Sequence, residues 1–149
     1  MIMKKRFFVA GIVTTITNLA LHAAAYFLVL KDFYRSHPAV SEEFMNQLSR
    51  KPEDLVWWAM AVTSLAMGFL ITWVMDRSGA KTFLSGLKQG FILGSLFWSS
   101  VNFGLYASSN YFSAASVFVD SASSTTVMTV AGAVAAWLLG AGKKPVAGR

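Results

Sequence analysis

The sequence predicts an all-α fold, an integral membrane four-helix bundle with both termini cytoplasmic. Four stretches, residues 7–30, 55–75, 90–112 and 121–141, are apolar and close to the ~20 residues that a helix needs to cross about 30 Å of hydrocarbon. Hydrophobic residues make up 55% of the 149-residue chain and charged residues 13%, and the mean hydropathy is +0.52. A soluble domain of this length is far less apolar.

The first stretch follows Lys4, Lys5 and Arg6, an order that imitates a secretory signal peptide. The apolar run continues through residues 26–30, which is too long for the hydrophobic core of a signal. We therefore expect a retained first helix. The other spans and one loop account for the rest of the chain, so residues 1–149 are predicted to form a single transmembrane domain.

The loop at residues 31–54 is the one sizeable segment between the predicted spans. Ser41 followed by two glutamates is typical of a helix N-cap with acidic residues in the first turn, and it predicts a short interfacial helix over 42–50. Pro52 is predicted to start the second span, because proline is tolerated in the first turn of a helix. The third helix is expected to begin near Thr82.

The distribution of basic residues predicts the orientation in the membrane. With the N-terminus inside, the inner segments hold nine basic residues and the outer segments four, and cytoplasmic segments are the ones enriched in Lys and Arg. This favours a multi-pass protein of the inner (cytoplasmic) membrane. The inner residues are Lys4, Lys5, Arg6, Arg77, Lys81, Lys88, Lys143, Lys144 and Arg149, and the outer ones are Lys31, Arg35, Arg50 and Lys51.

Small residues at helical spacing predict where the helices pack. In lipid, close approach of backbones and interhelical hydrogen bonds drive association, and small residues permit that approach. We expect internal packing of one bundle, with a homo-oligomer or partner contact as the alternative. The two small-residue lines are Gly86, Gly90 and Gly94 in the third span and Gly132, Ala136 and Gly140 in the fourth.

His22 is the first candidate for chemistry, because an ionisable residue inside a membrane helix is costly and usually faces the bundle interior. The functional interpretations are a proton relay, a polar ligand pocket, or an axial ligand to a haem or chlorin. The structural interpretation is a neutral imidazole that hydrogen-bonds between helices. The residues predicted to reach similar depth and form a cluster with it are Asn18, Asn102, Tyr106 and Thr125.

Two aspartates are explained by helix ends. Asp120 is predicted to cap the fourth span and to favour the positive end of its dipole. The alternative is a polar gate or ligand site that Asp120 forms with Asn110, Ser109 and Ser121. Asp76 is predicted to form an interfacial ion pair with a neighbouring basic residue.

Several activities lack their sequence signatures. There is no cysteine, no His-Glu-x-x-His motif, and no serine–histidine–acid set with persuasive spacing, so neither a metal site nor an enzyme is predicted. The net charge of +6 comes from residues that flank the apolar spans, so we expect contact with the lipid bilayer and not with nucleic acid. The sequence indicates no particular cofactor.

Short motifs in the second half of the chain resemble a family of small uncharacterised bacterial four-helix inner-membrane proteins, grouped as a domain of unknown function. The resemblance implies a four-helix bundle in the inner membrane and supplies no activity. Some members carry Tyr-Asp-x-x-Asn where this chain has Tyr106-Ala107 before Asn110. The motifs are Gly86…Gly90…Gly94-Ser95-Leu96-Phe97, Tyr106-Ala107-Ser108-Ser109-Asn110, Val119-Asp120 and a final helix of small residues.

The leading hypothesis is a non-enzymatic polytopic inner-membrane protein that serves as an accessory or assembly subunit of a membrane complex. Its partners would be other membrane-protein subunits or further copies of the chain. Two alternatives stay open. One is a small oligomeric transporter or channel, and the other is a membrane protein that binds a ligand or cofactor through the cluster around His22.

Overall fold

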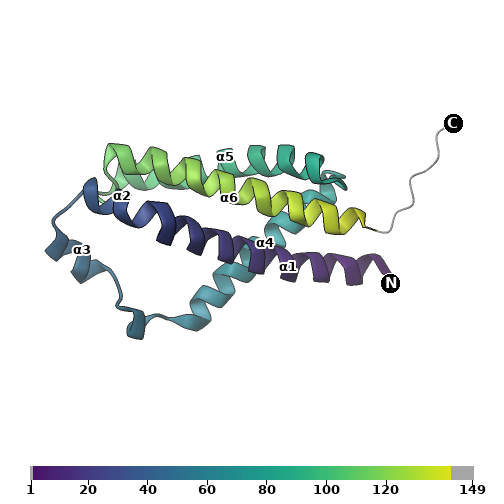
Figure 1. The fold of residues 1–149 in the computed structure, drawn as a ribbon, viewed down its shortest axis with the longest axis horizontal. Helices are drawn as coiled ribbons and strands as arrows, with labels where there is room; N and C mark the ends of the chain where they lie inside the picture. Colours follow the sequence, from purple (N-terminus) through teal and green to yellow (C-terminus); the bar gives the residue numbers. More distant parts are fainter. Residues whose placement is uncertain (1, 142–149) are drawn as a thin grey trace.

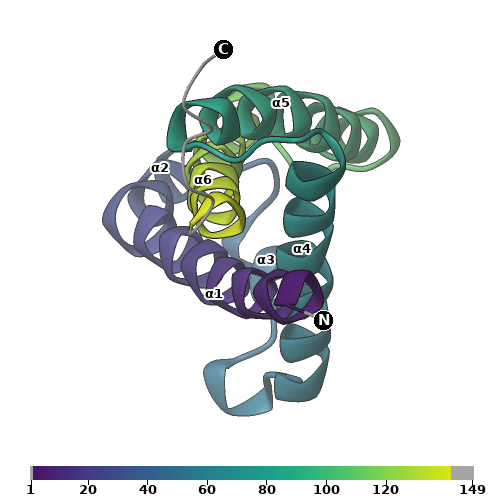
Figure 2. The same ribbon diagram turned by 90° about the vertical axis from the view of Figure 1, so that its right-hand side faces the viewer.

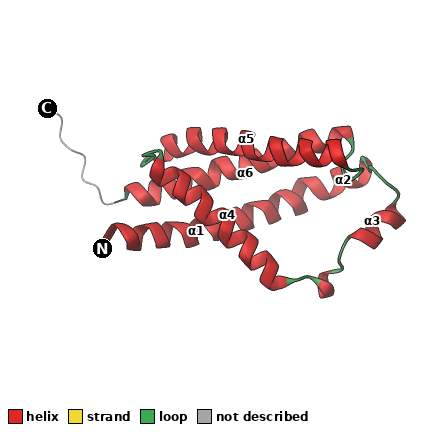
Figure 3. Cartoon of the chain, turned by 180° about the vertical axis from the view of Figure 1, so that it is seen from behind, coloured by secondary structure: helices red, strands yellow, loops and turns green. Residues whose placement is uncertain are grey.

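The computed structural model describes residues 2–141, and these residues form helices joined by short connections, without a strand (Figure 3). The basic residues Lys143, Lys144 and Arg149, used in the topology prediction, lie outside the described residues. The helices are α1 (Ile2–Ala25), η1 (a π-helix, Tyr26–Leu30), α2 (Lys31–Ser36), α3 (Glu42–Leu48), η2 (a 3₁₀ helix, Pro52–Asp54), α4 (Trp57–Arg77), α5 (Phe83–Ser108) and α6 (Ala114–Gly140).

Helix α6 is the central element of the fold. It packs against α5, α1 and α4, and these three helices surround it in the view along the bundle (Figure 2). The long helices α1, α5 and α6 run side by side, while α4 crosses them obliquely (Figure 1). The core cluster joins residues from all three of α1, α4 and α6, for example Ala10, Ile71 and Met128, each fully buried.

Three helical segments are long and apolar enough to cross a membrane among the residues described: Lys5–Ser36, Trp57–Arg77 and Ala114–Gly140. This indicates a membrane protein. The predicted third span, 90–112, falls on α5, which is not one of the three. Helix α5 contains the polar residues Lys88, Gln89 and Asn102 together with several serines.

The first helix is longer than the predicted span of 7–30. Helices α1, η1 and α2 follow one another without a break, so helical backbone continues to Ser36 and the predicted loop 31–54 begins too early. The charged residues after Leu30 do not end the helix. It ends at His37, which has left the helical region (φ −130°, ψ 57°), because the residue before a proline disfavours helical backbone and Pro38 follows.

The loop contains the short helix α3, whose N-cap was predicted correctly: the Ser41 side chain accepts a hydrogen bond from the Phe44 N–H at 3.4 Å. The predicted role of Pro52 was wrong. Pro52–Asp54 forms the separate helix η2, and α4 begins only at Trp57 because the backbone at Leu55 is extended. The predicted start of the third helix near Thr82 is confirmed, because Thr82 is the N-cap of α5, whereas the helix ends at Ser108, before the predicted end of the span at residue 112.

The glycines of α5 face the backbone of α6. A Cβ atom added at Gly86 would lie 2.5 Å from the Gly132 carbonyl oxygen, and one at Gly90 would lie 2.8 Å from that of Met128. At Gly94 the nearest atom would be Thr125 Cα at 3.1 Å. The missing side chains let the backbones of α5 and α6 approach closely. The contact between these two helices is the most extensive between any two elements of the described chain.

Other glycines serve different contacts. Gly140, predicted to belong to the same line as Gly132, lies against the α4–α5 connection, where an added Cβ would be 1.8 Å from the Lys81 carbonyl oxygen. Gly68 brings α4 onto α1, because its Cβ would be 2.6 Å from Thr15 Cα. Ala136 is buried and lies beside Gly86.

The start of α1, the α4–α5 connection and the end of α6 lie at one end of the bundle, whereas α2, α3 and the α5–α6 connection lie at the other (Figures 1 and 3). We call the latter the α3 end. The two ends of the described chain lie together because the chain runs along the bundle an even number of times, in α1, α4, α5 and α6.

The predicted ion pair of Asp76 is confirmed: Lys81 Nζ lies 2.5 Å from Asp76 Oδ1. The Lys81 side chain is 26% exposed and the Asp76 side chain is 38% exposed, so the pair is partly solvated. We expect Asp76→Asn to lower the free energy of unfolding by only about 0.5 kcal/mol, as for other surface ion pairs. Unfolding measured in detergent at low and at high salt checks this, because the loss should shrink as salt screens the pair. A loss that is unchanged by salt would contradict it.

Candidate functional site

Asp120 does not cap a helix, contrary to the prediction. Helix α6 begins well before the predicted start at residue 121, because the side chain of Ser113 accepts a hydrogen bond from the Ser116 N–H at 3.2 Å and acts as the N-cap. Asp120 therefore lies in the second turn of α6. At this position its carboxylate is directed at neighbouring helices and not at the free amides of its own helix end.

The Asp120 carboxylate joins three helical segments at the α3 end. Its Oδ1 accepts a hydrogen bond from the Tyr34 hydroxyl of α2, and its Oδ2 accepts one from Asn102 Nδ2 of α5 at 2.7 Å. The same amide lies 3.2 Å from the hydroxyl oxygen of Ser121. We call Tyr34, Asn102, Asp120 and Ser121 the Asp120 clamp. Because hydrogen bonds to a charged acceptor are stronger than neutral ones, it ties the helices together at this end.

Tyr34 was not predicted as a member of this site. The π-helix η1 widens one turn of the first helix, and its backbone hydrogen bond runs from Lys31 N–H to the Tyr26 carbonyl five residues back. This changes the direction in which the residues after Leu30 point, and Tyr34 reaches Asp120. No signal in the sequence marks a π-helix here, although π-helical turns often occur at functional sites.

The cluster predicted around His22 is not assembled as one unit. His22 lies edge-on to the indole of Trp98, with ring centroids 5.7 Å apart. Asn102, predicted to join His22, instead bonds to Asp120, and Tyr106 is 42% exposed.

Asn18 and Thr125, the remaining members of the predicted cluster, are both buried. Thr125 belongs to the contact between α6 and α5. Asn18 Oδ1 is one of three buried side-chain polar atoms without a hydrogen-bond partner in the described structure, and the others are Thr14 Oγ1 and Trp98 Nε1. These atoms mark the middle of the bundle as the place where polar groups are least well satisfied.

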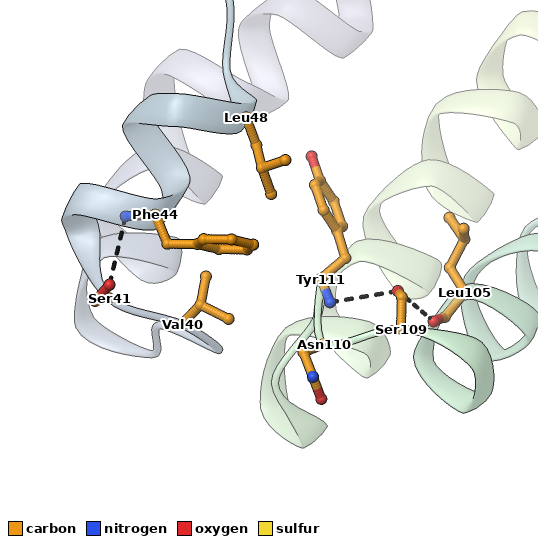
Figure 4. A pocket seen from close by; sticks show the side chains of 8 residues that line it. All are labelled: Val40, Ser41, Phe44, Leu48, Leu105, Ser109, Asn110 and Tyr111. Carbon is orange, nitrogen blue, oxygen red and sulfur yellow. Dashed lines mark hydrogen bonds between the residues drawn. The ribbon is translucent and has the colours of Figure 1, made fainter.

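Ser109 and Asn110, predicted to accompany Asp120 and Ser121, belong to a different part of the α3 end. The Ser109 hydroxyl donates to the Leu105 carbonyl at 2.7 Å and so closes the end of α5. Both residues line a cavity of about 750 Å³ between α3 and the α5–α6 connection (Figure 4). Apolar side chains face each other across it, with Val40, Phe44 and Leu48 on the α3 side and Leu105 and Tyr111 opposite. We call it the apolar hollow.

A second cavity, of about 310 Å³, opens onto Asp120 itself. Aromatic side chains dominate its wall, and we call it the aromatic hollow. The hydroxyl groups of Ser113 and Ser116 both donate a hydrogen bond to the carbonyl oxygen of His37, at 3.0 and 3.2 Å. These bonds hold the loop that contains His37 over the cavity. The residues that line it are Tyr26, Tyr34, His37, Pro38, Ala39, Met45, Tyr111, Phe112, Ser116 and Asp120.

Among residues 2–141, no group of three His, Cys, Asp or Glu side chains comes together. Fold and site thus define a class: an all-helical chain with three potential membrane-crossing helices and a polar clamp at one end. No family model matches the chain, and neither does any curated protein or solved structure.

Proposed function

We propose that the chain is a non-enzymatic, multi-pass inner-membrane protein that serves as an accessory or assembly subunit of a larger membrane complex. Four helices, α1 with its extension, α4, α5 and α6, would cross the bilayer with both termini in the cytoplasm. The common end of α1, α6 and the α4–α5 connection supports this topology, as does the excess of basic residues predicted on that side.

Helix α5 is proposed as the fourth span although it is not one of the three segments that are apolar enough to cross a membrane by length and composition. Its polar Asn102 and its glycines are buried against α6, so they do not meet lipid. The outward side of α5 is apolar, as the exposed side chains of Phe91, Ile92 and Leu96 show. The mean hydropathy of α5 includes this buried face, which lipid would not contact. The resemblance to small bacterial four-helix proteins supports the same interpretation.

The observation that carries the proposed function is the exposure of the first half of α4, residues 57–66, which does not pack against the other helices described. A line of small residues runs along this helix at helical spacing: Ala61, Ser64, Gly68 and Thr72. Gly68 and Thr72 are buried, and Gly68 packs on α1. Ala61 is exposed, because the first half of α4 leaves the bundle and nearly every residue from Trp57 to Ala66 is exposed (Figure 1).

A packing face that continues beyond its partner helix within the described chain suits a helix from another protein. In lipid, small and hydroxyl-bearing residues are the ones that let helices associate closely. We therefore propose that a transmembrane helix of a partner subunit packs on the first half of α4, along the line that includes Ala61. A second copy of the chain is the competing occupant.

Replacing Ala61 by phenylalanine is expected to abolish partner association, because the bulky ring prevents close approach of a second helix. The measurement is purification of the native chain and of Ala61→Phe from native membranes in mild detergent, with mass spectrometry of the proteins that copurify. In a separate, otherwise native chain, a small diazirine residue at position 61 reports the contact by photo-crosslinking. A defined adduct with another membrane protein, lost in a second purification after Ser64→Phe, supports the proposal.

Leu96→Phe is the matched control, because Leu96 is 70% exposed on the outward side of α5. This substitution is expected to leave the association intact. Crosslinks from position 61 to lipid alone would contradict the proposal. An adduct of twice the monomer mass would show that the helix packed on α4 belongs to a second copy of this chain and not to a different subunit.

A further inference from the structure

We propose that the aromatic hollow binds an organic ammonium group, with Asp120 as its counter-ion. The first argument is the wall of the cavity. Four aromatic side chains line it: Tyr26 and Tyr34 from the first helix and its extension, and Tyr111 and Phe112 from the α5–α6 connection. Aromatic rings attract cations electrostatically, and several rings around one cavity are a known means of recognising quaternary ammonium groups.

The second argument is charge. Asp120 is the one carboxylate in the wall, and none of the described residues that line the cavity is a lysine or an arginine. The basic side chain in the wall is that of His37, whose Nδ1 lies 3.1 Å from the Phe33 carbonyl oxygen and whose ring stacks on Phe33, and it makes no ion pair with Asp120. The clamp satisfies hydrogen bonds of Asp120 but not its charge, because Tyr34 and Asn102 are neutral donors. Within the described residues, Asp120 forms no salt bridge.

A carboxylate has about four lone-pair directions, and the clamp occupies only one on each oxygen, so Asp120 retains acceptor capacity. A partly buried charge that lacks an opposite charge is unfavourable, and a cation in the cavity removes that deficit. The carboxylate thus stays in place and attracts a cation without breaking the contacts that hold the helices.

The third argument is size and surroundings. The volume of about 310 Å³ lies at the lower end of the range for small-molecule sites. Tyr111 also lines the apolar hollow, so the two cavities share a wall. A compact ammonium head suits the aromatic hollow, and an attached apolar group would find the neighbouring cavity. The ammonium group comes either from a lipid head group or from a free amine.

The test uses the full-length protein in a maltoside detergent, which carries no ammonium group. Choline is titrated by calorimetry and compared with 3,3-dimethylbutan-1-ol, which has the same shape without the charge. Choline is expected to bind, and the alcohol is expected to bind at least about tenfold more weakly, since it lacks both the ion pair and the cation–π attraction. Equal binding of the two compounds, or no binding of choline, overturns the proposal.

Two variants identify the site. Tyr111→Leu is expected to weaken choline binding about fivefold or more, and Asp120→Asn about tenfold or more. Tyr106→Leu is the control, because this exposed tyrosine lies outside the wall of the cavity. Should Asp120→Asn fail to fold, Tyr111→Leu still decides, because Tyr111 is 51% exposed. Unchanged affinity in Tyr111→Leu overturns the assignment.

The source of the ammonium group is distinguished in lipid nanodiscs. In discs of phosphatidylethanolamine, a lipid head group would compete with choline and weaken its apparent binding relative to discs of uncharged digalactosyl diacylglycerol. That result assigns the site to a lipid head group. Equal choline affinity in the two kinds of disc assigns it to a free amine.

Discussion

Replacing Gly86 by alanine is expected to lower the free energy of unfolding by about 2–3 kcal/mol, at the upper end of the usual cost of overpacking. The added Cβ would lie 2.5 Å from the Gly132 carbonyl oxygen and 2.6 Å from Ala133 Cα. Both are backbone atoms of α6, which cannot rotate away as a flexible side chain would. The two helices must separate, and neighbouring contacts along the whole interface weaken.

The matched control for this substitution is Gly104→Ala in the same helix. Apart from its two chain neighbours and the nearby backbone of α5 itself, no atom of the described chain lies within 4 Å of a Cβ built there. Alanine also favours helix more than glycine does, so this variant should be neutral or slightly stabilised. Unfolding of both variants in mixed micelles with increasing dodecyl sulfate, followed by tryptophan fluorescence and circular dichroism, measures the difference. Equal losses in the two variants would show that close approach of α5 and α6 is not what the glycines provide.

Removing the carboxylate of the Asp120 clamp, in Asp120→Ala, is expected to cost about 2–3 kcal/mol of unfolding free energy. The Tyr34 hydroxyl loses its acceptor, and the buried Asn102 amide keeps only the longer contact of 3.2 Å to the Ser121 hydroxyl. An unpaired buried donor is costlier than an absent one, because it lacks water as well. We therefore expect Tyr34→Phe, which removes a donor and leaves no donor unpaired, to cost less.

The control for Asp120 is Asp32→Ala, an exposed carboxylate in α2, near the same end of the molecule. Its loss should change stability by less than about 0.5 kcal/mol, as is usual for surface substitutions. A cycle that combines Tyr34→Phe with Asp120→Asn tests the coupling directly, since residues in one hydrogen-bond network give non-additive effects. Additive effects would mean that the two side chains do not depend on each other.

The local features of the fold were predictable because they depend on a few neighbouring residues. A glycine at every fourth position presents one flat line on any helix, and Gly86, Gly90 and Gly94 do lie against α6. The cap at Ser41 was equally local. The helix N-cap at Ser113 was missed because the apolar pattern was taken to begin at residue 121, and this led to the wrong role for Asp120.

The candidate site was harder to predict, because it depends on how helices are rotated relative to each other. Asn102 was correctly chosen as a polar residue that faces inward, but it was assigned to His22 and not to Asp120. Depth in the membrane can be estimated from the sequence, whereas rotation about each helix axis is fixed by packing across the bundle. The same holds for α4, whose oblique path leaves Ala61 outside the core although its spacing matched that of Gly68 (Figure 2).

The π-helical turn between Tyr26 and Leu30 has a consequence for the direction of the helix that follows it. Such a turn holds one residue more than a regular turn, and each residue advances the helix by about 100°. Deleting one residue from this turn would therefore rotate α2 by about 100° relative to α1 and turn Tyr34 away from Asp120. The hydrogen bond between α2 and α6 thus depends on one residue of length in this turn as well as on the identity of the two side chains.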